Sequence, residues 1–179
     1  GGLSAFPQVF CIPMKNLAII GGGHAHVEVL RQLGLNPMPD ADVTLISPDR
    51  HTPYSGMLPG LVAGHYTFDE CHIDLAPLAQ FAGARFLQTS VAAIDPARRQ
   101  LKLEDGTQLN YDIASIDVGS TPPAQQIAGA REHAIAVKPV KHLLAAWEAL
   151  IDRVRTGEVR SLAVVGGGAA GVEMLLAMQ

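Results

Sequence analysis

The sequence predicts an α/β protein of three layers, in which a parallel sheet is joined by a small antiparallel β-meander. Short, largely apolar runs at 17–20, 42–46 and 162–165 predict strands buried on both faces, as parallel strands are, and the first and last of them are apolar throughout. Two of these runs stop at a glycine cluster that opens a helical pattern, as in a strand–helix–strand unit. An Asp-Gly pair at 105–106 predicts the tight turn of an antiparallel hairpin.

The first strand–helix–strand unit lies near the beginning of the chain. Strand 17–20 is followed by apolar residues at helical spacing, among them Val27 and Leu30, and Gly34 is the expected end of that helix. Strand 42–46 then completes the unit.

A long connection follows the second strand. Residues 47–66 hold three prolines and three glycines, which predicts a long structured loop, and loops of that length in a compact domain are usually functional. His51, Tyr54 and Met57 on this loop are candidate site residues, with exposed loop residues as the alternative. Helical periodicity returns over 72–82 and stops at a glycine.

The remaining elements alternate strand and helix patterns. In order, the sequence predicts strands at 86–87, 91–94, 101–103 and 111–118, an irregular linker at 121–138, a helix over 140–154, the strand 162–165 and a helix from 166 onward.

The composition excludes several classes of protein. Among the 179 residues, 48% are apolar and 17% charged, which excludes a disordered chain and a coiled coil. The formal net charge of −4 lacks the basic excess of a nucleic-acid binder, so we expect no nucleic-acid partner. Cys11 and Cys71 lie far apart and form no CxxC, so neither a disulfide framework nor a cysteine zinc site is predicted, and no metal is expected. No apolar run reaches the about 18 residues of a membrane span.

The first residues are expected outside the fold. Residues 1–13 contain two prolines and lack the positive charge that opens a signal peptide. They are interpreted as a leader, an artificial extension or an upstream mis-start, with Met14 as the natural beginning.

An internal repeat indicates two nucleotide sites. Residues 17–28 align with 162–173 at an offset of 145, with eight of the twelve positions identical. In such a turn the first glycine bends the chain, the second admits a pyrophosphate and the third lets the helix pack on the sheet. Two copies between a strand and a helix are much stronger than one.

The two copies differ at their third glycine. The second is complete with Gly166, Gly168 and Gly171, whereas in the first His26 replaces the glycine. The candidate phosphate contacts of the first copy, at the turn and the helix start, are Gly21, Gly23, His24 and Ala25. Two sites in one chain suggest FAD supplied with hydride by NAD(P)H.

Five segments carry a resemblance to a family: GGGHAHVEVLR (21–31), SPDRHTPYSGMLPG (47–60), HIDLAPLAQFAGARF (72–86), YDIASIDVGSTPP (111–123) and GGGAAGVE (166–173). With them the chain resembles the FAD-dependent pyridine nucleotide-disulfide oxidoreductases. The likeness is strongest to the NADH dehydrogenase-like branch that includes sulfide–quinone reductases, and there to the flavoprotein module fused to selenide, water dikinase.

The resemblance implies a Rossmann-like FAD/NAD(P)-binding fold, of which this chain is an incomplete N-terminal fragment. It implies a FAD-binding domain at 14–122, then a linker and the start of an NAD(P)H-binding domain at 123–179. The first glycine motif holds the FAD pyrophosphate and the second holds NAD(P)H. The further cofactor contacts that it implies are Ser47, Pro48, Arg50 and Tyr54 along the ribose and flavin, Val91 at the adenine, Gly119 at the crossover, and Glu173 near the nicotinamide.

Two residues depart from the family pattern. Ser47 stands where an acid often binds the ribose hydroxyls, and Asp117 opens a crossover that usually reads Ala-Thr-Gly. A fragment also leaves the FAD groove open on one side, so weak or absent FAD binding is expected of these 179 residues.

The resemblance implies that the full-length protein is an enzyme that passes hydride from NAD(P)H to FAD and on to a quinone-like or other small-molecule acceptor. It further implies a cytoplasmic location, peripheral membrane contact, and a homodimer or fused partner domain. No catalytic residue is assigned. A non-catalytic nucleotide-binding or regulatory module of a larger protein and a simple one-site NAD(P) dehydrogenase are the alternatives.

Two single residues have structural interpretations. Glu28 is expected in the first turn of its helix, where an acid complements the helix dipole, and Glu173 in the repeat has the same alternative. Cys71 is expected to be a buried, inert thiol because no strongly basic neighbour activates it.

Overall fold

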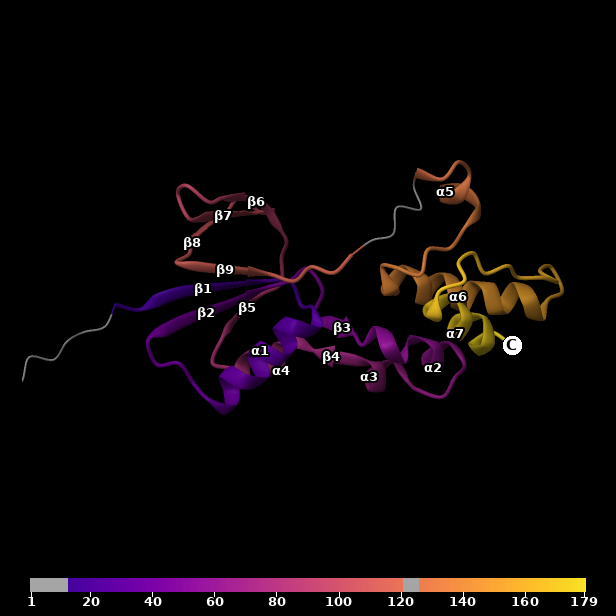
Figure 1. Cartoon of the computed structure of the whole chain (residues 1–179), viewed down its shortest axis with the longest axis horizontal. Coiled ribbons are helices and arrows are strands. Elements are labelled where there is room, and N and C mark those ends of the chain that lie inside the picture. The colour runs from indigo at the N-terminus through magenta and orange to yellow at the C-terminus, as the bar shows by residue number, and fades with distance from the viewer. Residues whose placement is uncertain (1–12, 121–125) are drawn as a thin grey trace, which may run out of the picture. The chain divides into compact units, whose positions relative to one another are not determined.

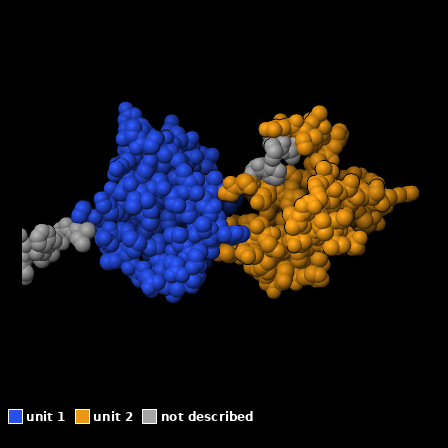
Figure 2. Space-filling view, viewed as in Figure 1, with its two compact units in different colours: residues 1–50, 75–118 blue, residues 51–74, 119–179 orange. Residues whose placement is uncertain are grey.

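A computed structural model describes residues 13–120 and 126–179 (Figure 1). The chain divides into two compact units, shown in Figure 2. Unit 1 holds the described residues of 1–50 and 75–118, and unit 2 holds 51–74 and the described residues of 119–179. The segment expected outside the fold, 1–13, lies outside the described residues except for its last member. The boundary between a FAD domain and an NAD(P)H domain stays a prediction.

Unit 1 alternates strands with two helices before a run of strands. Its elements are β1 (Lys15–Ile20), α1 (His24–Leu35), β2 (Ala41–Ile46), α4 (Leu75–Phe81), β5 (Arg85–Leu87), β6 (Val91–Asp95), β7 (Gln100–Leu103), β8 (Gln108–Asn110) and β9 (Ile113–Ile116).

Unit 2 is mainly helical. Its elements are β3 (His51–Pro53), the 3-10 helix η1 (Ser55–Met57), α2 (Leu58–Val62), α3 (Phe68–Cys71), β4 (His72–Asp74), α5 (Ala130–His133), α6 (Val140–Arg155) and α7 (Ala169–Ala177).

The parallel sheet at the centre of unit 1 has the strand order β5-β2-β1-β9 (Figure 1). Alternate residues of its strands face opposite layers, as the two-residue period of a strand requires. Ile19 and Leu45 pack with α1 and α4 in one core, whereas Ala18 and Ile46 pack with Leu101 of β7 in the other. Helices, parallel sheet and antiparallel sheet therefore form three layers, and the predicted fold class is confirmed.

The antiparallel sheet β6-β7-β8 is the predicted meander. Its second turn lies at the Asp-Gly pair, where Gly106 has a φ of +86° and Asp105 Oδ1 accepts a hydrogen bond of 2.8 Å from Thr107 N. A positive φ is accessible to glycine without steric cost, which is why this pair marks the hairpin.

Unit 2 has a core of its own. Leu58 and Val62 of α2 are buried with Val140 and Leu143 of α6 and with Met174 of α7. The helix predicted over 140–154 is confirmed as α6.

The connection after β2 is more ordered than predicted. Instead of one loop over 47–66, it contains the strand β3, the helix η1 and the helix α2. Residues 72–74 at the start of the helix predicted over 72–82 form β4, antiparallel to β3, and only α4 is helical. Pairing between distant residues outweighed the local helical spacing there. A proline is tolerated in the first turn of α2 and at the end of a two-stranded edge such as β3.

Two further predictions are wrong: the position where helix α1 ends, and the strand at 162–165. Helix α1 does not stop at Gly34 but continues to Leu35, and Gly34 leaves room for the Phe81 ring, which a Cβ at that position would overlap. Residues 162–165 form no strand, and Val165 is 94% exposed. A strand needs a partner to satisfy its backbone, and no described strand pairs with this segment.

Candidate dinucleotide-binding site

The carboxyl ends of the parallel strands meet at one edge of the sheet in unit 1. Gly21 follows β1, Ser47 follows β2 and Asp117 follows β9. Gly21 N donates a 2.7 Å hydrogen bond to Ile46 O, and Asp117 N donates a 2.9 Å bond to Ile20 O, so these strand ends are tied together. Ligands of open α/β sheets bind at this edge.

A tight corner connects β1 to α1. Gly21 has a φ of +93°, and a Cβ on it would overlap the carbonyl group of Asp117. Gly23 is the N-cap of α1, and its N–H donates to Asp117 O at 3.1 Å. Both predicted glycines are thus required by close approach of the segment that follows β9.

His26 takes the place of the third glycine without opening the corner. The side chain is 2% exposed, its Nδ1 lies 2.7 Å from Gly21 O, and its Nε2 lies 2.8 Å from Ser115 Oγ. Because a carbonyl oxygen only accepts, Nδ1 carries a proton and donates to Gly21 O. The imidazole therefore joins the turn, α1 and β9.

The carboxylate of Asp117 lies at the N-terminus of α1. Its Oδ2 accepts a 3.1 Å hydrogen bond from Ala25 N, in the first turn of the helix. A Cβ on Gly23 would overlap this carboxylate, so the space at that glycine holds the Asp117 side chain. The position is favourable for an anion, because the first amides of a helix lack partners within it and carry its positive dipole end.

The cofactor contacts predicted on the connection after β2 are divided between the two units: Ser47, Pro48 and Arg50 lie in unit 1, and Tyr54 lies in unit 2. Ser47 is buried, its N donates to Leu87 O at 3.1 Å, and its Oγ donates to Asp49 O at 2.9 Å, so the hydroxyl supports its own loop. Pro48 O accepts from Gln88 Nε2 at 3.5 Å, and Arg50 O accepts from Leu75 N at 2.8 Å. Tyr54 belongs to unit 2 and is 50% exposed.

Three further predicted residues lie at element ends. Val91 begins β6 and is half-buried. Gly119 lies three residues after the end of β9 and has a φ of +74°. His24 is the first residue of α1 and is exposed.

The second glycine corner lies in unit 2 before α7. Gly166 has a φ of +123°, and a Cβ on Gly166, Gly167 or Gly168 would meet no atom within 4 Å. A Cβ on Gly171 would overlap Gly166 O, so the third glycine permits close packing of α7 on the turn. His26 and Gly171 thus face the equivalent carbonyl oxygen in their two corners.

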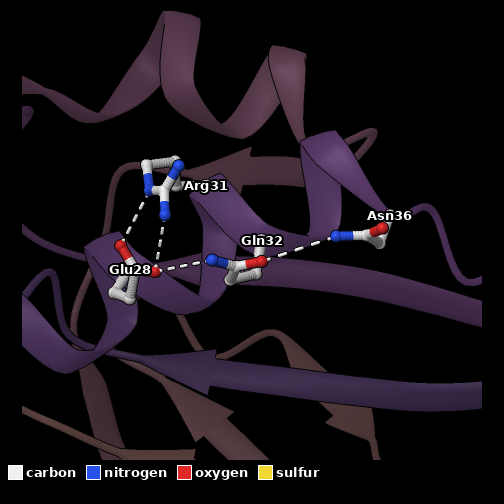
Figure 3. A network of polar contacts seen from close by, with 4 residues as sticks. All are labelled: Glu28, Arg31, Gln32 and Asn36. Atoms are coloured by element: carbon white, nitrogen blue, oxygen red, sulfur yellow. Dashed lines mark hydrogen bonds and ion pairs between the residues drawn. The ribbon is translucent and has the colours of Figure 1, made fainter.

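The two repeated glutamates both lie one turn into their helices. Neither α1 nor α7 has an acidic residue in its first turn, so the first-turn prediction for Glu28 is wrong. Glu28 instead accepts hydrogen bonds from Arg31 and from Gln32 on the exposed face of α1 (Figure 3). These contacts, Arg31 before Gln32, lower the pKa of Glu28 from 4.5 to about 2. Glu173 is exposed.

An aromatic and acidic cluster lies beside the β3–β4 pair in unit 2. The Phe68 ring stacks on His72 with centroids 3.7 Å apart, and the His51 ring meets it edge-on at 5.9 Å. His51 Nε2 lies 3.8 Å from Asp74 Oδ2. Cys71 nearby is 2% exposed, and burial followed by the charge of Glu70 raises the pKa of its thiol, which confirms the buried thiol.

Sequence reasoning missed two side chains of the first corner. The sequence marks Asp117 only as a departure from a family pattern, although its place directly after the last parallel strand puts it at the ligand-binding edge. The sequence marks His26 only as the replacement of a glycine, although an imidazole can satisfy the carbonyl of a tight turn.

The part of the chain that the structure describes contains neither a metal-binding cluster nor a helix that could span a membrane. In residues 13–120 and 126–179, His, Cys, Asp and Glu form no group of three or more that could hold a metal ion. No helix in this described part has both the length and the apolarity to cross a membrane.

Sequence comparisons give consistent matches. A family model described as pyridine nucleotide-disulphide oxidoreductase matches residues 15–178. The NADH dehydrogenase-like protein YutJ of Bacillus subtilis is 26% identical over 167 residues, which cover 90% of this chain and 44% of that protein. The sulfide-quinone reductase of Aquifex aeolicus is 30% identical over 105 residues, covering 59% of this chain and 24% of that protein. The chain therefore spans less than half the length of these relatives.

Solved structures show the same fold. The X-ray structure of the sulfide:quinone oxidoreductase from Aquifex aeolicus has a TM-score of 0.65 at 26% identity, covering 79% of this chain and 32% of that one. NDH2 from Plasmodium falciparum in complex with NADH has a TM-score of 0.76 at 22% identity, covering 91% and 36%.

Proposed function

The chain belongs to the pyridine nucleotide-disulphide oxidoreductase family, and from that premise we propose that it is the dinucleotide-binding part of a flavoprotein that oxidises NAD(P)H. FAD is assigned to the corner between β1 and α1, and NAD(P)H to the corner before α7. When bound, FAD supplies the redox chemistry, accepting hydride and passing electrons to an acceptor. The chain supplies binding, orientation and electrostatics.

The observation that carries this proposal is the donor set at the start of α1. Ala25 N–H already binds a carboxylate oxygen, Asp117 Oδ2, which fits a site for the negatively charged oxygens of a diphosphate. The corner lies at the carboxyl edge of a parallel sheet, where the dipole of α1 favours negative charge. The residues present therefore fit a dinucleotide phosphate, on condition that the Asp117 side chain moves.

The corner before α7 supports the second nucleotide. Its three consecutive glycines have open space where their side chains would be, so backbone amides can approach a pyrophosphate closely. Gly166, Gly168 and Gly171 are assigned to NAD(P)H on this ground, and Glu173 is assigned to its nicotinamide half.

A quinone is the proposed electron acceptor, because one relative is a sulfide-quinone reductase. Membrane contact, a homodimer or fused domain, and a cytoplasmic location stay predictions.

A spectroscopic titration tests the proposal. We expect the 179-residue chain to quench the fluorescence of added FAD on binding, weakly if the rest of the protein contributes to the groove. In the full-length protein, we expect an oxidised flavin absorbance band that bleaches when NADH is added without oxygen. A full-length protein purified without flavin, and unable to bind it on addition, would contradict the proposal.

A non-catalytic nucleotide-binding or regulatory module is the second candidate. It is compatible with Asp117 occupying the first corner, because a chain that binds a nucleotide only at the open corner before α7 holds no flavin to reduce. In that case NADH would bind to the full-length protein without bleaching a flavin.

A further inference from the structure

We propose that Asp117 is a displaceable cap of α1 that competes with the dinucleotide phosphate for the first corner. This inference rests on the proposed function, because it concerns the same site. According to this inference, the Asp117 side chain controls the affinity of the site for FAD.

The first step is that Asp117 occupies the start of α1 with both its backbone and its side chain. Its carbonyl oxygen accepts from Gly23 N at 3.1 Å, and its Oδ2 accepts from Ala25 N at 3.1 Å. Such a cap satisfies an amide that has no partner inside the helix, and thereby stabilises the free protein.

The second step is that the carboxylate lies in the space that a phosphate needs. The second glycine of this motif admits a pyrophosphate because it has no side chain. At Gly23 a Cβ would overlap the Asp117 carboxylate, whereas at the equivalent Gly168 a Cβ would meet no atom within 4 Å. The two corners therefore differ in what fills the space at this glycine.

The third step is electrostatic. A diphosphate and a carboxylate have the same sign, so both gain from the α1 dipole but repel each other at one amide. Binding of the diphosphate must break the hydrogen bond from Ala25 N to Asp117, and the side chain must turn away. Removing the carboxylate consequently has opposite effects on the free protein and on FAD affinity.

A matched control lies at the other end of β9. Asp112 precedes this strand as Asp117 follows it, and its Oδ2 accepts a 2.8 Å hydrogen bond from a backbone amide, Asn16 N. β1 runs from Lys15 to Ile20, and the glycine corner begins after its last residue. Asn16 therefore lies at the opposite end of this strand from the corner. Asp112→Ala therefore removes a comparable bond from a backbone amide to a carboxylate, together with the exposed ion pair to Lys15 at 3.7 Å, without touching the site.

The experiment titrates FAD and riboflavin, which lacks phosphate, into the 179-residue chain and follows flavin fluorescence. Thermal unfolding of the flavin-free variants is measured alongside. We expect Asp117→Ala to bind FAD about tenfold more tightly than the unchanged chain, with riboflavin affinity unchanged, and to unfold about 3 °C lower without flavin. Asp117→Asn keeps a neutral capping oxygen. We expect its FAD affinity and its unfolding temperature to lie between those of the unchanged chain and those of Asp117→Ala. Asp112→Ala lowers the unfolding temperature and leaves FAD affinity unchanged.

The outcomes separate the two proposals. If the unchanged chain binds FAD and neither Asp117 variant binds it more tightly than Asp112→Ala, the competition is wrong and the proposed function stands. If Asp117→Ala weakens FAD binding, Asp117 helps to hold the cofactor and the inference is overturned. If the 179-residue chain binds no FAD, the same variants are compared in the full-length protein. If none of those binds FAD either, the proposed function falls and the inference falls with it.

Discussion

At position 26 a histidine stands where the second corner has a glycine, and both meet the carbonyl oxygen of the first glycine of their corner. In the second corner the contact is close because Gly171 has no side chain. In the first corner, the His26 Nδ1–H satisfies the carbonyl, and Nε2 accepts the hydroxyl hydrogen of Ser115 in the neutral tautomer. The hydrogen bond of the buried His26 side chain thus takes the place, in the first corner, of the close backbone packing that Gly171 permits in the second.

His26→Ala is expected to destabilise the protein by about 2–4 kcal/mol, because it leaves a cavity and removes the buried hydrogen bond to Gly21 O and the partly buried one to Ser115 Oγ. Urea unfolding measures this loss. Ser115→Ala removes one of the same bonds and is expected to cost about 1 kcal/mol. A loss below that of the Ser115 variant would show that His26 does not hold the corner together.

At the scale of the element, α1 carries a polar network on its exposed face. Glu28 accepts from Arg31 at 2.8 and 2.9 Å and from Gln32 at 2.8 Å, and Gln32 accepts from Asn36 at 3.4 Å (Figure 3). Contacts between residues three and four apart support a helix along its own length.

The network predicts a pH dependence. Because the folded pKa of Glu28 is lowered from 4.5 to about 2, its stabilising effect is present above pH 4.5 and is lost as the pH falls toward 2. Carboxyl NMR shifts of Glu28 measured against pH should show the low pKa. Arg31→Ala should raise it toward the ordinary value, whereas Arg160→Ala, an equal change of charge at an exposed site of unit 2, should not. An unchanged pKa in Arg31→Ala would refute the pairing.

Elements with strong local patterns could be predicted from the sequence, and elements made by distant pairing could not. The strand ending at Ile20 and the helix beginning at Val140 have continuous or amphipathic apolar patterns that few other structures satisfy. The β3–β4 pair depends on residues about twenty positions apart, so nothing local distinguishes β4 from the helix that follows it. The apolar run 162–165 shows the reverse, a strand pattern without a partner.

At the scale of the whole molecule, the described residues form two units with separate cores. Leu45 is fully buried among strands and helices of unit 1, and Met174 is buried among α2, α6 and α7 of unit 2. The cores have no residue in common.

We expect this separation to show in hydrogen exchange. Leu45→Ala and Met174→Ala each remove buried side-chain volume, at a cost of about 2–5 kcal/mol to the unit concerned. Leu45→Ala should speed exchange in β1 and α1, and Met174→Ala should speed exchange in α2 and α6, as measured by mass spectrometry of peptides. Equal acceleration of both units by either variant would mean that the chain unfolds as one cooperative body.

Of the candidate site, the sequence allowed the glycines and their corners to be predicted, because a strand, a glycine turn and a helix are contiguous in the chain. Asp117 lies 92 residues from Ala25, and only the register of β9 beside β1 brings them together. The same holds for Ser115 and His26, which are 89 residues apart.

The imidazole at position 26 also bears on how such corners are recognised in other chains. A search pattern that demands glycine at the third position would pass over residues 21–26, although the bend there is complete. What this position requires is compatibility with the carbonyl oxygen of the first glycine, met either by an absent side chain or by one that donates a hydrogen. Scans that admit histidine at this point, when a hydroxyl-bearing strand residue is available to its other nitrogen, would recover corners now overlooked.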